Sequence, residues 1–264
     1  MSRPARNRPT AKMRLDQLLV ERGLASSWTE ARALLLAGRV FRAEVRLEKP
    51  GEFVPTDCPL EVRGPAHPWV SRGGVKLAHA LDHFRIDPAG LVALDLGAST
   101  GGFTDVLLAR GAARVYAVDV GRGQLAWKLR RDPRVVVLER TNARRLTREL
   151  VPEQVEVIVC DLSFIGLRLA LPVALALAAP GARLVALIKP QFELAKGRVG
   201  KGGVVRDPAL HAEACDAVRT WLDSQPRWLV IGLTESPITG TDGNREFVIA
   251  ARHTAEAAVH PACP

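Results

Sequence analysis

The sequence lacks any run of about 18 consecutive apolar residues, which is the length that a membrane-spanning helix requires. The longest apolar candidate, residues 165–180, is interrupted by Arg168 and Pro172. The first residues carry positive charge but no apolar segment follows them, so they are not typical of a secretory signal peptide. These absences predict a cytoplasmic protein without a membrane partner.

Cysteine is also scarce, with four residues at positions 58, 160, 215 and 263 and no CxxC or CxxH spacing among them. A disulfide framework or a structural zinc site needs more cysteines, or closer spacing, than this. The sequence therefore predicts reduced, structural thiols and no bound metal ion. It leaves the oligomeric state open, with a monomer favoured.

Lysine is the third scarce residue, because only seven of the 37 basic residues are lysines. A lysine in so arginine-rich a chain suggests a position that needs an amine instead of a guanidinium. The net charge is +9, and residues 1–72 hold 13 basic and 8 acidic residues, a net of +5. A basic segment of this kind suits a polyphosphate partner such as nucleic acid.

The residue pattern divides the chain into two domains. Residues 14–22 and 28–37 have helical spacing, each followed by a glycine, and Ser27 and Glu30 form the pattern of a capping box. Two prolines and a glycine in residues 63–68 indicate a linker. We predict a basic tail (1–12), a small α+β domain (13–62), a linker (63–69), a large domain (70–252) and a C-terminal tail (253–264).

The large domain alternates strand and helix patterns, which is typical of an α/β fold with a mostly parallel, doubly wound sheet. Residues 165–178 are predicted as one helix and residues 182–188 as the strand that follows it. The last two strands, 228–233 and 246–251, are joined only by a turn-rich loop. This connection predicts one antiparallel strand, at an edge of the sheet.

A glycine-rich turn at residues 94–102 (Leu-Asp-Leu-Gly-Ala-Ser-Thr-Gly-Gly) follows the first strand of this domain. It matches neither GxGxxG nor a P-loop, so a dinucleotide or phosphate ligand is disfavoured, and a turn without a ligand stays open. Asp119 ends the next strand, where an acid can hold ribose hydroxyls or can simply cap a helix. Together the two features favour a nucleoside cofactor without phosphates, and S-adenosylmethionine fits.

Four charged residues are expected to meet at one rim of the sheet. Asp161 and Lys189 each follow a strand, Glu246 opens the last strand, and Lys76 lies on the helix before the first strand. Leu162 and Ser163 follow Asp161, in place of the prolines that accompany methylation of base amino groups. Lys189 follows an apolar strand, so its amine is expected to be partly desolvated. A lysine that merely extends to solvent from a buried stem is the alternative.

These residues resemble a known family. Residues 70–252 resemble the FtsJ-type ribose 2′-O-methyltransferases, whose Lys–Asp–Lys–Glu tetrad corresponds in order to Lys76, Asp161, Lys189 and Glu246. Residues 13–62 resemble the S-four (alpha-L) RNA-binding domain through Arg-Leu-Asp at 14–16 and the segment 31–40. The combination resembles the TlyA (hemolysin A) family, as do residues 69–77, 117–125 and 189–193.

The resemblance implies a cytoplasmic enzyme that methylates the 2′-hydroxyl of cytidine in ribosomal RNA, with S-adenosylmethionine as cofactor and ribosomal RNA or ribosomal subunits as partner. The tetrad would be catalytic, with Lys189 as the base or the group that orients the hydroxyl. The expected cofactor-binding residues are Asp95, Gly97, Ala98, Ser99, Gly101, Gly102, Asp119 and Asn142. The expected RNA-binding residues are Arg14, Arg32, Arg39, Arg42 and Arg72.

Two other functions stay open from the sequence. A methyltransferase-like domain could bind and remodel RNA without turnover, although the complete tetrad speaks against this. The family's historical name implies a membrane-active hemolysin, which the absence of a signal peptide, a spanning segment and a strongly amphipathic cationic helix disfavours.

Overall fold

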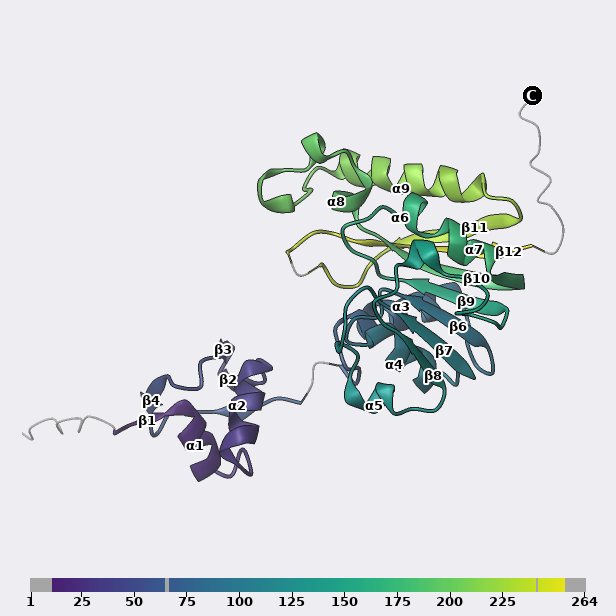
Figure 1. Ribbon diagram of the computed structural model, residues 1–264. Coiled ribbons are helices and arrows are strands. Elements are labelled where there is room, and N and C mark those ends of the chain that lie inside the picture. Colours follow the sequence, from purple (N-terminus) through teal and green to yellow (C-terminus); the bar gives the residue numbers. More distant parts are fainter. Residues whose placement is uncertain (1–10, 65–66, 241, 255–264) are drawn as a thin grey trace, which may run out of the picture. The chain divides into compact units, whose positions relative to one another are not determined.

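The computed structural model describes residues 11–64, 67–240 and 242–254. The chain divides into two compact units, residues 1–68 and residues 69–264 (Figure 1). Most of the predicted basic tail, two residues of the predicted linker and most of the predicted C-terminal tail, including Cys263, lie outside the described residues.

The N-terminal unit packs two helices against short antiparallel strands. Its core is formed by leucines of both helices together with apolar residues of the strands, among them Leu15, Leu19, Leu35 and Val40. Two strands pair as β1–β4 and three as β3–β2–β5. The elements are β1 (Lys12–Arg14), α1 (Leu15–Glu21), α2 (Trp28–Leu36), β2 (Val40–Arg42), β3 (Val45–Leu47), β4 (Phe53–Pro55) and β5 (Glu61–Val62).

The predicted capping box at α2 forms only in part. The Ser27 hydroxyl accepts the backbone N–H of Glu30 at 3.2 Å, as expected for an N-cap. The Glu30 carboxylate, however, accepts the backbone N–H of Ser26, at 2.7 Å, and not that of Ser27. The reciprocal bond of the box is therefore displaced by one residue.

The C-terminal unit contains a seven-stranded sheet in the order β11–β12–β10–β9–β6–β7–β8. All of its pairings are parallel except those made by β12, which confirms the predicted α/β class with a mostly parallel sheet. The strands are β6 (Val92–Leu96), β7 (Arg114–Val118), β8 (Val135–Leu138), β9 (Val155–Cys160), β10 (Ala178–Ile188), β11 (Trp228–Glu235) and β12 (Phe247–His253).

The antiparallel strand is present, but its predicted place at the edge is wrong. β12 lies between β10 and β11, and β11 forms the edge. The side chains explain this order, because residues 248–251 of β12 are a continuous apolar run that is fully buried, as suits an interior strand. In β11, by contrast, Ile231 is exposed.

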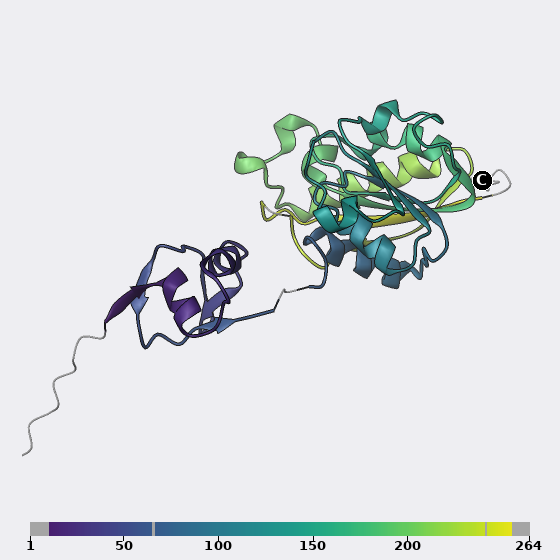
Figure 2. The same cartoon turned by 60° about the horizontal axis from the view of Figure 1, so that its bottom comes forward.

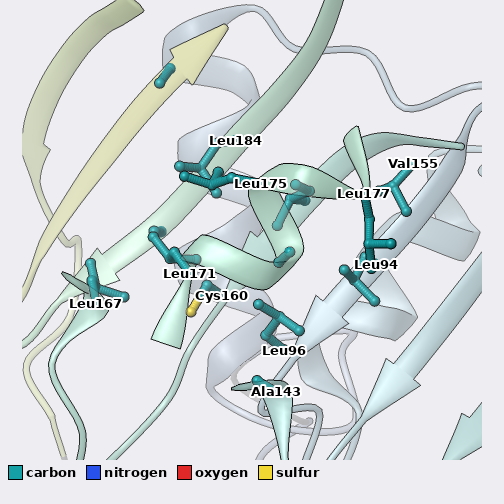
Figure 3. Packing of buried hydrophobic residues seen from close by; sticks show 14 of the residues in the cluster. Leu94, Leu96, Ala143, Val155, Cys160, Leu167, Leu171, Leu175, Leu177 and Leu184 are labelled. Atoms are coloured by element: carbon teal, nitrogen blue, oxygen red, sulfur yellow. The ribbon is translucent and has the colours of Figure 1, made fainter. Parts of the chain in front are cut away.

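Helices cover both faces of this sheet (Figure 2). One face packs against α3 (Gly73–Phe84), α4 (Gly102–Ala109) and α5 (Trp127–Arg130). The other packs against η1 (Ala143–Arg145), α6 (Leu167–Ala170), α7 (Pro172–Ala176) and α9 (Pro208–Asp223). Neighbouring residues of a strand serve opposite faces, as Ala93 and Leu94 of β6 do. Figure 3 shows leucines of α6 and α7 packed against β6 and β9.

The single helix predicted for residues 165–178 is wrong. Pro172 has no backbone N–H and begins the second of two short helices, α6 and α7. The next strand, β10, then begins at Ala178, earlier than predicted, and its pairing with β9 shifts register between Ala178 and Arg183. The short elements α8 (Pro190–Glu193), η2 (Lys196–Arg198) and η3 (Lys201–Gly203) are below the length at which periodicity is informative.

Cys58, Cys160 and Cys215 are free and buried. Burial raises the pKa of the Cys160 and Cys215 thiols to about 12, so both stay protonated and poorly nucleophilic. Within the described ranges, no helix is both long and apolar enough to cross a membrane.

Candidate active site

The structure brings together the four charged residues that were expected to meet. Asp161 follows β9 and Lys189 follows β10, at the carboxyl edge of the sheet. Glu246 precedes β12, and because β12 is antiparallel to β10, its first residues lie at the same edge. Lys76 reaches this edge from α3.

The four side chains form an alternating row of charges. Lys76 Nζ lies 2.5 Å from Glu246 Oε2 and 4.0 Å from Asp161 Oδ2, and Lys189 Nζ lies 2.6 Å from Asp161 Oδ1. Lys189 Nζ also donates a hydrogen bond to Ser163 Oγ at 3.0 Å. Lys76, Lys189 and Glu246 are each less than 9% exposed. Buried charges are tolerated only when paired, and here two cations balance two anions.

The glycine-rich turn between β6 and α4 passes directly beside this row. Gly97 has φ +85°, and a Cβ placed on it would lie 2.7 Å from the backbone oxygen of Asp161. Ser99 also has a positive φ, of 48°. The close approach requires glycine at position 97 and brings the turn within reach of the reacting groups.

Asp119 holds this turn in place. Its Oδ2 accepts the backbone N–H of Ser99 at 2.8 Å and its Oδ1 accepts that of Gly121 at 2.6 Å. The side chain of Ser99 in turn donates to Gln124 at 3.2 Å. Asp119 therefore fixes the turn through the protein's own backbone, whatever ligand it contacts.

Asp95 does not line the site, contrary to its predicted contact with the cofactor. It is fully buried beneath the turn, and Thr104 of α4 donates a hydrogen bond to its Oδ2 at 2.6 Å. Burial raises the pKa of Asp95 to about 7, against the opposing effect of that hydrogen bond. Gly101 is also turned inward, against Leu125. Both residues support the turn from below.

An open cavity of about 780 Å³ lies over the tetrad and the turn. Such a volume suits a small-molecule cofactor. Of the predicted cofactor residues, Gly97, Ala98, Ser99 and Gly102 line it. Asn142 instead lines a second hollow, of about 680 Å³, together with Val120 and Leu162. The two hollows share Ser163, Phe164, Gln191 and Phe192 in their linings, so they lie next to each other. We call the two together the depression along the sheet edge.

Two aromatic residues at this junction escaped the sequence analysis. Phe164 is 92% exposed and has φ 67°, and its ring lies 5.2 Å from that of Phe192. Ser163, the partner of Lys189, was noted only as a replacement for proline. Ser163 and Phe164 lie shortly after the end of β9, and Phe192 lies shortly after the end of β10. This place in the sequence is the signal that could have identified them as site residues.

The wall opposite the glycine-rich turn is built from two segments, residues 199–203, which include η3, and residues 239–240 with 242–246. Asn244 joins them and is 1% exposed. Its Oδ1 accepts the backbone N–H of Val205 at 2.9 Å, and its Nδ2 donates to the backbone oxygen of Gly203 at 3.0 Å. The backbone oxygen of Asn244 accepts the N–H of Gly240 at 2.9 Å.

The five predicted RNA-binding arginines lie in different settings. Arg14 pairs with the buried Asp16 at 2.7 Å and its guanidinium lies 5.6 Å from the ring centroid of Trp28. Arg32 and Arg42 are exposed, while Arg39 donates to the backbone oxygen of Arg63. Arg72 belongs to the C-terminal unit, where it donates to the backbone oxygen of Thr239 and lines the cavity.

Metal ligands were not found at this site. Among the residues that the structure describes, no three His, Cys, Asp or Glu side chains gather in a way that could hold a metal ion.

Comparison with known proteins gives matches to both units. The FtsJ-like methyltransferase model matches residues 69–253, and the S4 domain model matches residues 13–57. The 16S/23S rRNA (cytidine-2′-O)-methyltransferase TlyA of Mycobacterium tuberculosis is 49% identical, over 91% of this chain and 90% of its own length. Hemolysin A of Brachyspira hyodysenteriae is 39% identical, over 89% and 98%. A solved hemolysin homologue from Streptococcus thermophilus is 38% identical with a TM-score of 0.72, over 93% and 90%.

Proposed function

Because the chain belongs to the FtsJ-like methyltransferase family and carries an S4 domain, we propose that it methylates the ribose 2′-hydroxyl of a cytidine in ribosomal RNA, with S-adenosylmethionine as the methyl donor. The observation that carries the proposal is the buried Glu246–Lys76–Asp161–Lys189 row beside the glycine-rich turn. The relative from Mycobacterium tuberculosis, whose name states this activity, supports the choice of substrate.

The depression along the sheet edge fits the proposed cofactor. S-adenosylmethionine supplies an electrophilic methyl group and needs no phosphate-binding loop. Gly97, Ala98 and Ser99 would hold its amino-acid part, because the glycine at position 97 lets this turn pass close to the Asp161 backbone at the cavity wall. Asp119 would hold the ribose hydroxyls at the end of β7. The hollow at Asn142, Val120 and Leu162 would take the adenine.

The tetrad would act on the ribose hydroxyl, which is a weak nucleophile. Lys189 would contact this hydroxyl and either take its proton or orient it while the proton passes to water. Asp161, 2.6 Å away, would stabilise the resulting ammonium group, and Lys76 with Glu246 would hold Asp161 in place. Placing the hydroxyl in line with the methyl group is the larger part of such catalysis.

The N-terminal unit would hold the RNA. A single ribose hydroxyl offers little recognition, so the surrounding RNA must be bound elsewhere. Residues 1–72 carry a net charge of +5, and Arg14, Arg32, Arg39 and Arg42 would contact phosphates. From the proposed partner, ribosomal RNA or an assembled subunit, we infer a cytoplasmic location.

The decisive experiment maps ribose methylation in ribosomal RNA from cells with and without the gene. We expect one or more cytidines to lose their 2′-O-methyl group in the deletion strain and to regain it when purified protein and S-adenosylmethionine are added to that RNA or its subunits. Identical methylation maps from the two strains, with no methyl transfer in vitro, would overturn the proposal.

A further inference from the structure

A tryptophan on the surface of the C-terminal unit is unusually accessible. Trp127, in α5, is 69% exposed, although tryptophan is among the residues that proteins bury most. The exposure of Trp127 follows from its position between two residues that point inward. Leu125 and Leu129 point inward and are 6% and 3% exposed, and both pack against Gly101 of the glycine-rich turn. Trp127 therefore projects outward from a firmly seated helix.

One basic group lies beside this ring, and a second belongs to the next residue in the chain. The guanidinium of Arg131, one helical turn away, lies 5.7 Å from the ring centroid of Trp127. Lys128 pairs with Asp105 at 2.8 Å but keeps 58% of its side chain exposed. An aromatic face next to two accessible cations attracts a ligand that carries both a planar ring and negative charge.

The position of α5 connects this patch with the cavity. The backbone N–H of Ala126 donates to the backbone oxygen of Thr100 at 3.0 Å, and Thr100 lines the cavity. On the other side, the Asp105 carboxylate that binds Lys128 also accepts the backbone N–H of Val70 at 2.9 Å. Val70 is the second residue of the C-terminal unit, so the polypeptide from the S4 domain enters at this place.

We propose that Trp127, Arg131 and Lys128 form a platform on which an unpaired base of the substrate RNA stacks, beside the nucleotide that enters the cavity. This inference rests on the proposed function and assigns it an additional RNA contact. Stacking on an aromatic ring is tolerant of base identity, while Arg131 and Lys128 attract the flanking phosphates. The platform would hold the strand at the rim of the cavity, on the side where the linker enters.

The test uses the full chain with the substitution Trp127→Ala, and unmethylated 16S and 23S rRNA and both isolated subunits as probes. We expect RNA affinity to fall roughly 5- to 100-fold, as the loss of one stacked base implies. S-adenosylmethionine affinity and the melting temperature should stay unchanged, because the side chain contacts solvent and not the turn. Trp127→Phe should restore most of the affinity, and ultraviolet cross-linking of the wild-type protein should yield a nucleotide adduct on the peptide that contains Trp127.

Two control variants each remove one exposed side chain, apolar in one case and basic in the other, at another place on the surface. Ile231→Ala, on edge strand β11, and Arg219→Ala, in α9, should bind RNA like the wild type. RNA affinity of Trp127→Ala within twofold of the wild type would overturn the proposal. A loss of affinity seen only with assembled subunits would also overturn the proposal, because Trp127 would then contact a ribosomal protein and not RNA. Absence of methyl transfer by the wild type would contradict the proposed function, whereas binding and cross-linking report on Trp127 separately.

Discussion

The two walls of the cavity are held in place by different means. The glycine-rich turn is held by contacts over 9 and 20 residues, since Asp95 accepts a hydrogen bond from Thr104 and Asp119 accepts the N–H of Ser99. The opposite wall consists of segments about 40 residues apart in sequence, which Asn244 joins. Both walls depend on tertiary contacts, but those of the second wall span the longer separations. We therefore expect the second wall to be the more easily disturbed.

This contrast also separates two tasks. In the proposed function, the turn would bind the cofactor, while the tetrad and the Asn244 wall would contact the ribose and the RNA. Substitutions that affect the turn should change cofactor affinity, and substitutions in the tetrad or the Asn244 wall should change turnover. Each of the following measurements tests this division of tasks.

The largest effect is expected at Lys189. Lys189→Ala should lower turnover by roughly 10²- to 10⁴-fold, the usual contribution of a proton-transfer group, while S-adenosylmethionine affinity stays near normal. Lys189→Arg should fail as well, because a guanidinium does not give up its proton. Single-turnover methyl transfer and calorimetric titration of the cofactor measure the two quantities. Activity of Lys189→Ala within a few-fold of the wild type would remove this residue from catalysis.

The next effect concerns the Asn244 wall. Asn244→Ala should free the N–H of Val205 and lower kcat/KM for RNA by about 10- to 100-fold through misplacement of the wall, without weakening the cofactor. Hydrogen exchange of the Val205 amide should become faster. Val218→Ala, which leaves a cavity at a buried position of α9, controls for a general loss of stability. If both variants lose activity in proportion to their melting temperatures, the wall has no separate role.

A smaller effect, of opposite kind, is expected at Asp119. Asp119→Ala removes the acceptor for Ser99 and the expected ribose contact, and it should weaken S-adenosylmethionine about tenfold while RNA affinity is retained. Asp82→Ala, which removes an exposed acid on α3, is the matched control. Calorimetry that finds the same cofactor affinity in Asp119→Ala and wild type would place Asp119 outside the site.

The smallest effect on activity is expected at Asp95, where stability is the better measure. The pKa of Asp95 is raised to about 7, so between about pH 4 and 7 the unfolded chain releases a proton that the folded chain retains. The free energy of unfolding therefore falls as pH rises through this window. Asp95→Asn should remove this fall and stabilise the protein at neutral pH by on the order of 4 kcal/mol.

Chemical denaturation of the wild type and of Asp95→Asn at several pH values measures this difference in the free energy of unfolding. All other carboxylates are the same in both proteins, so their pH dependence cancels in the comparison. Parallel stability curves for wild type and Asp95→Asn would contradict the raised pKa of Asp95. A large loss of cofactor affinity in the variant would mean that Asp95 does more than support the turn.

Several features of this protein follow from the sequence alone. Alternating strand and helix patterns predicted the mostly parallel sheet, and residues 94–102 predicted the turn after its first strand. Asp161 and Lys189 could be picked out because parallel strands end at a common edge, and Glu246 because it opens the strand that runs the other way. Lys76 lies on a helix, and the family resemblance supported its place in the set. The family resemblance, carried by short blocks such as 189–193, was confirmed.

Other features were decided only by the tertiary structure. The place of β12 inside the sheet, the break at Pro172, the burial of Asp95 and the link through Asn244 all depend on what packs against each residue. The exposure of Trp127 likewise depends on the packing of Leu125 and Leu129 against Gly101. Local patterns specify which face of an element is apolar, but burial and hydrogen bonding between distant segments determine which neighbour covers it, and that choice is made only when the whole chain has packed.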